Sequence, residues 1–90
     1  MEEQVQSLTF GQKAVRVQFN ANQDQDVAEV KNLYAKLIDK LKDLSKVKTS
    51  IEGKSPEWMG RTAREFSIAV TELESSAHWA VKGLTAHFQD

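Results

Sequence analysis

Two runs of apolar residues, repeating at intervals of three and four positions, constrain the fold of this chain more than any other feature. This spacing places the apolar side chains along one side of an α-helix. The first run comprises Val27, Val30, Leu33, Tyr34, Leu37, Ile38, Leu41 and Leu44, and the second comprises Phe66, Val70, Leu73, Ala77, Ala80, Val81, Leu84 and Phe88. We therefore predict an all-α fold with helices over about 26–46 and about 56–87.

The segment between the two runs, 47–55, is predicted to be a loop because it is polar and contains Gly53. Ser55 followed by Pro56 is a typical helix start, with serine at the N-cap and proline at the first helical position. Two long helices joined by a loop of this length pack antiparallel. The sequence thus predicts that residues 1–90 form a single helical hairpin domain.

Local sequence also predicts how the two helices begin. Asp26 fits the N-cap of the first helix, and Glu29, three residues later, would complete a capping box. Gly60 weakens the start of the second helix, so the residues before Arg61 are expected to form a separate turn.

Residues 1–25 are predicted to form an N-terminal arm or short helix. Val5, Leu8 and Phe10 are irregularly spaced before Gly11, which indicates a frayed helical turn and a loop. Residues 14–19 alternate and are rich in valine, which predicts a short extended segment. No second strand pattern accompanies it, so the segment is expected to lie against the helices or against another subunit.

The chain has 90 residues and no cysteine, so it holds one domain at most and has no disulfide to stabilise it. So short a chain buries a modest share of its surface, and oligomerisation is a common remedy. Tyr34, Trp58 and Trp79 have larger apolar bodies than a seam between two helices covers. Either the arm covers these rings or other subunits do, and the chain length favours a homo-oligomer.

The charges nearly cancel, with 12 basic and 13 acidic residues and a net charge of -1. Such a chain has no field that would attract DNA or RNA polymers. Its apolar stretches are too short to span a membrane, and the acidic Met1-Glu2-Glu3 leads into no apolar run of a signal peptide. A cytoplasmic protein without a membrane partner is expected.

Candidate catalytic and metal-binding residues are few. His78 and His87 are nine residues apart and point in different directions from one helix. Glu74 and His78 are four residues apart, a spacing that is common by chance on a polar helix face. The four glycines are scattered, and no nucleophile elbow or phosphate-binding glycine loop is present. The sequence therefore predicts no enzyme, no metal site and no cofactor.

A polar stripe along the second helix is the remaining candidate for a binding surface. It comprises Arg64, Ser67, Thr71, Ser75, His78 and Lys82. An ordinary solvated face is the simpler interpretation, although hydroxyls beside cations also suit a phosphate-bearing ligand or a close helix contact. Near the start of the first helix, Lys31 is placed to bind an anion, and Phe19 either stacks on a planar base or anchors the core.

The block REFSIAVTELESSAHWAVKGLT, residues 64–85, resembles the signature helix of the phage anti-CBASS sponge family, in which Thr, Leu-Glu, Trp-Ala and Lys recur. Residues 19–39 resemble the first helix of that family and the loop before it, so the resemblance covers about 15–86. The Thoeris anti-defence sponges share the hairpin and carry an additional β-rich domain, for which this chain is too short.

The resemblance implies a bacteriophage protein that assembles as a homohexamer and sequesters cyclic oligonucleotide messengers of host immunity without cleaving them. It places cyclic dinucleotides in pockets between paired subunits, at Phe19, Asn20 and Lys31. Phenylalanine stands where the family more often has tyrosine, and its spacing to the lysine is shorter here. A cyclic trinucleotide site near a threefold axis would use Arg64, Thr71 and Ser75.

The leading hypothesis is therefore a cyclic di- and trinucleotide sponge that blocks CBASS immunity. The alternatives are a small helical module that pairs with a protein partner through its exposed aromatics, and a phage scaffolding protein whose oligomer has no nucleotide ligand.

Overall fold

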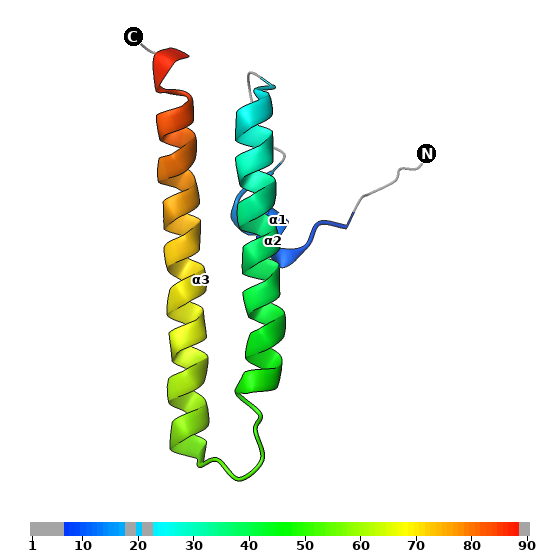
Figure 1. Cartoon of the computed structure of the whole chain (residues 1–90), viewed down its shortest axis with the longest axis vertical. Helices are drawn as coiled ribbons and strands as arrows, with labels where there is room; N and C mark the ends of the chain where they lie inside the picture. Colours follow the sequence, from blue (N-terminus) through cyan, green and yellow to red (C-terminus); the bar gives the residue numbers. More distant parts are fainter. Residues whose placement is uncertain (1–6, 18–19, 21–22, 89–90) are drawn as a thin grey trace.

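The computed structural model describes residues 7–17, 20 and 23–88. Its elements are α1 (Phe10–Ala14), α2 (Gln25–Lys48), α3 (Pro56–Leu84) and the 3-10 turn η1 (Ala86–Phe88). Figure 1 shows α2 and α3 side by side and antiparallel, with the connecting loop at one end and α1 beside α2. The part of the chain that is described is helical and has no strand, so the all-α prediction is confirmed.

The N-cap of helix α2 lies two residues before the predicted one. Asp24, in an extended conformation, accepts hydrogen bonds from the backbone N–H groups of Asp26 at 2.8 Å and Val27 at 3.1 Å. The prediction of Asp26 as the cap is wrong, because Asp24 already satisfies these donors. Asp26 lies instead in the first turn, where its negative charge favours the positive end of the helix dipole.

Helix α3 is continuous from its first turn. The Ser55 hydroxyl accepts from the backbone N–H of Trp58 at 3.0 Å, and Pro56 occupies the first helical position, as the sequence predicts. The prediction of a separate turn before Arg61 is wrong, because Gly60 lies within one helix of 29 residues. A glycine costs a helix only about 1 kcal/mol, which the packing of so long a helix offsets.

The N-terminal arm differs most from the prediction. Residues 14–17 are not extended, because Ala14 ends α1 and the next three residues form a turn; Gln18 and Phe19 lie outside the described residues. Thr9 caps α1 and forms a capping box with Gln12. In the described part of the arm the helical turn begins at Phe10, whereas Val5 lies outside the described residues.

The core is small and lies where α1, α2 and α3 meet. Its buried members are Val15, Ala35, Ile38, Val70 and Ala77, flanked by the partly buried Ala14, Val17, Tyr34, Leu41 and Leu73. Among the helices in the described ranges, none combines the length and apolar character needed to cross a bilayer.

Candidate functional site

The candidate site lies where the turn after α1 crosses α2. The backbone N–H of Gly11 donates to the Asp39 carboxylate at 2.7 Å, which fixes α1 against α2. A Cβ at Gly11 would overlap the backbone carbonyl of Ala35, so the close approach of the two helices requires glycine. Val15, in the following turn, is 1% exposed and completes the core.

The turn itself is a Schellman motif. The N–H of Arg16 donates to the carbonyl of Lys13, and the N–H of Val17 donates to that of Gln12, both at 3.1 Å. Arg16 occupies the left-handed position of this motif, with a φ of 56°. Glycine is the usual residue there, because a Cβ is strained in that conformation. The exposed Arg16 is therefore less favourable than glycine for this backbone conformation.

Lys31 is buried beneath this turn. Its side chain is only 6% exposed, and its Nζ donates to the backbone carbonyl of Arg16 at 2.8 Å. Burial lowers the pKa of Lys31, and the positive charge of Arg16 lowers it further. Two cations thus lie close together, one buried and one exposed, which is an arrangement that suits a phosphate.

Asn20 shapes the loop that leads into α2. Its Nδ2 donates to the carbonyl of Asp24 at 2.8 Å, and its Oδ1 accepts from the N–H of Asp24 at 3.0 Å. Its own carbonyl accepts from the N–H of Gln23 at 2.9 Å. The side chain therefore holds the capping residue of α2 in place. Phe19 lies outside the described residues, so its predicted stacking role stays a prediction.

The polar stripe on α3 is exposed along its length. Arg64 and Thr71 line one shallow hollow together with Ser67, Ile68 and Glu72. Ser75 is exposed on the same helix but does not line this hollow. The structure therefore brings two of the three residues nominated for a trinucleotide together, on a surface that one chain leaves open.

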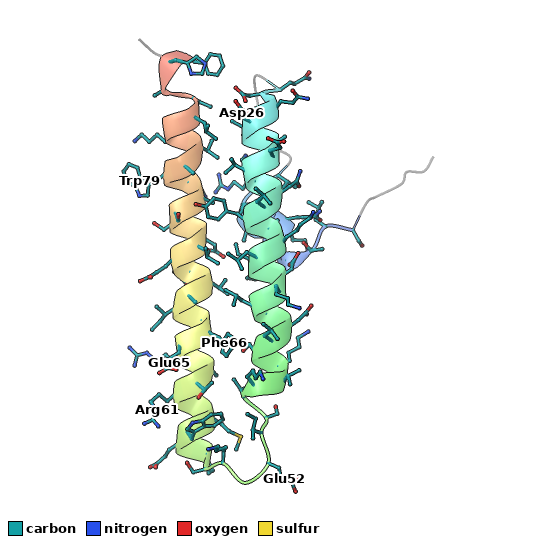
Figure 2. All side chains as sticks on the ribbon, viewed as in Figure 1. Asp26, Glu52, Arg61, Glu65, Phe66 and Trp79 are labelled. Atoms are coloured by element: carbon teal, nitrogen blue, oxygen red, sulfur yellow. The ribbon has the colours of Figure 1, made fainter. Side chains whose placement is uncertain are left out.

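A deeper groove runs between α1, α2 and α3. Phe10 and Phe66 line it, together with the hydroxyls of Ser45, Ser67 and Thr71. Lys42 also lines it, with its ammonium 4.4 Å from the centre of the Phe10 ring. Figure 2 shows Phe66 pointing from α3 toward α2. A cation–π pair within the chain thus forms part of the wall of this groove.

A third hollow, between α2 and α3, is largely apolar and open. Leu33 and Leu37 are 65% and 46% exposed, and they line a hollow with Tyr34, Leu73 and Ser76. The Tyr34 hydroxyl lies 2.6 Å from that of Ser76, which ties α2 to α3. Trp79 is 66% exposed and points away from α2 (Figure 2). The arm therefore leaves the Trp79 ring uncovered.

Residues 12–85 match a family model described as the Acb2/Tad1 hairpin domain. The chain belongs to the Acb2/Tad1 hairpin family. This is the family of anti-CBASS and anti-Thoeris sponge proteins, so the resemblance seen in the sequence is confirmed. No curated protein and no solved structure matches the chain.

The match to the Acb2/Tad1 hairpin covers most of the candidate site, from residue 12 onward. Arg16, Asn20 and Lys31 lie within it, as do Arg64 and Thr71 on α3. Phe10, which lines the groove beside Lys42, lies before the matched residues. No cluster of His, Cys, Asp and Glu able to hold a metal ion occurs in the described ranges.

The sequence analysis named Lys31 and Asn20 as candidates but not Arg16, which the structure places beside Lys31. Periodicity finds residues that share a helix face, whereas Arg16 reaches Lys31 through a turn. A glycine at the left-handed position would have indicated a turn in the sequence, whereas an arginine there gives no such indication.

Proposed function

We propose that this Acb2/Tad1 hairpin protein is a phage-encoded sponge that binds cyclic oligonucleotide messengers in the host cytoplasm and inhibits CBASS immunity by sequestration. The observation that carries the proposal is the pair of cations formed by Lys31 and Arg16 within the matched hairpin. A cyclic dinucleotide presents phosphates and planar bases, and cations beside an aromatic ring complement both.

The proposed cyclic dinucleotide pocket lies at Phe19, Asn20 and Lys31. Lys31 contributes positive charge in a poorly solvated place, where its attraction for a phosphate is stronger than in open water. Asn20 acts through the loop, because both polar atoms of its amide already bind Asp24. Phe19 is proposed to stack on a base. Sequestration needs no bond cleavage, so the protein is proposed to act without catalysis.

The functional form is proposed to be a homo-oligomer, and specifically a hexamer. The open apolar hollow lined by Leu33, Leu37 and Leu73 supports association, because exposed leucines that lie side by side often form a contact with another subunit. Ligand pockets between paired subunits would enclose the messenger more fully than the open surface of one chain does.

A separate cyclic trinucleotide site is proposed at Arg64, Thr71 and Ser75. The shallow hollow at Arg64 and Thr71 supports it, since a cation and a hydroxyl side by side can both donate to phosphate oxygens. So open a hollow would need neighbouring subunits to close it.

A protein-interaction module without a nucleotide ligand is the second candidate. Trp79 favours it, because a tryptophan that is 66% exposed and points away from the hairpin is typical of a protein contact. A scaffolding role has no comparable observation in its favour.

Thermal unfolding with a panel of cyclic GMP–AMP, cyclic di-AMP, cyclic di-GMP and cyclic tri-AMP tests the proposal. A ligand at about 100 times its Kd stabilises the folded state by about 2.7 kcal/mol, which raises the Tm measurably. Recovery of the intact ligand after heating distinguishes sequestration from cleavage, and light scattering on the same samples gives the oligomer number. No stabilisation by any member of the panel at high micromolar concentration would contradict the proposal and favour the interaction module.

A further inference from the structure

The fold does not explain why an arginine occupies position 16. Arg16 stands at the left-handed position after α1, with a φ of 56°. Glycine would adopt this conformation without strain, whereas other residues are strained there. Backbone geometry therefore gives no reason for an arginine at this position. Strained non-glycine residues of this kind cluster at ligand sites, where the side chain has a use.

The Arg16 side chain also has no hydrogen-bond or ion-pair partner among the residues that the structure describes. It is exposed, and no carboxylate in the described part of the chain pairs with it. The positive charge of Lys31 repels it, as the lowered pKa of Lys31 shows. The guanidinium therefore makes no stabilising contact with the residues that the structure describes.

Lys31 has the opposite character. It is buried, and its Nζ donates at 2.8 Å to the carbonyl of the same Arg16. This bond ties the turn to α2 at the residue whose side chain is exposed. Lys31 thus fixes the backbone of Arg16. The planar guanidinium of Arg16 makes no hydrogen bond to the residues that the structure describes, and its geometry is suited to bidentate binding of a phosphate.

Building on the proposed function, we infer that Arg16 is a ligand-binding residue that holds a phosphodiester of the cyclic dinucleotide, and that Lys31 positions it by binding its carbonyl. The exposed guanidinium meets the phosphate, and the buried ammonium keeps the turn closed and adds positive charge beneath it. Loss of one charge-assisted hydrogen bond of this kind weakens binding by about tenfold or more.

Arg16→Gly tests this inference, because it separates binding from folding. Glycine suits the left-handed position, so the variant should keep a Tm equal to or above that of the wild type while its Kd for the panel member that binds best rises about tenfold or more. Arg16→Lys keeps the charge and should retain part of the affinity. Arg61→Ala is the matched control, since Arg61 is exposed on α3 away from this turn and should bind as the wild type does (Figure 2).

Each outcome of this experiment has one meaning. Wild-type affinity in Arg16→Gly, or a fall in Tm that accompanies the loss of binding, overturns the role of Arg16 and leaves the sponge function standing. Absence of binding by the wild type to every member of the panel overturns the proposed function, and the inference with it.

Discussion

Replacing Gly11 by alanine should detach α1 from the hairpin. The new Cβ would overlap the backbone carbonyl of Ala35 and lie 2.9 Å from the Asp39 carboxylate. Neither neighbour yields easily, because the carbonyl belongs to the middle of α2 and the carboxylate accepts the N–H of Gly11 itself. Helix α1 must therefore move outward.

The magnitude follows from what that movement disrupts. The hydrogen bond from Gly11 to a carboxylate contributes about 1.5–3 kcal/mol, and full burial of the Val15 side chain contributes about 1.5–3 kcal/mol. Because α1 can shift without detaching fully, we expect the variant to lose about 2–4 kcal/mol in the free energy of unfolding. That is a large fraction of the stability of a small domain.

Urea unfolding followed by circular dichroism measures this loss, at one fixed protomer concentration because association contributes to stability. Gly60→Ala is the matched control. A Cβ at Gly60 meets nothing within 4 Å, so this variant should gain up to about 1 kcal/mol from helix propensity. A Gly11→Ala variant that is as stable as the wild type would refute the close packing of α1 on α2.

Two further predictions concern α2 and the buried lysine. Asp24→Ala should cost about 1 kcal/mol and Asp26→Ala clearly less, measured by urea unfolding, because Asp24 alone caps the helix; equal losses would contradict that. Because the pKa of Lys31 is lowered in the native state, the native protein loses the Lys31 proton at a lower pH than the unfolded chain does. Between the lowered pKa and the ordinary 10.5, the unfolded chain therefore binds more protons than the native protein. Wild-type stability should therefore rise with pH in this window relative to Lys31→Met, and a falling difference would refute the burial.

The candidate site was only partly predictable from the sequence. Lys31 could be named because a cation near a helix start suits an anion, but its burial depends on a turn that packs over it. Asn20 was named from the family resemblance, while its bonds to Asp24 became visible only in the structure. Arg16 could not be named from the sequence, because it stands in a left-handed backbone conformation that arginine rarely adopts.

The sequence by itself determined the hairpin. The three-and-four spacing of apolar residues and the Ser55-Pro56 start are local properties, and local patterns suffice to specify two long helices and the loop between them. The tertiary structure decided the conformation of the arm and the surroundings of Lys31. These depend on contacts such as Gly11 with Asp39, 28 residues apart, and Arg16 with Lys31, 15 residues apart, which no local pattern encodes.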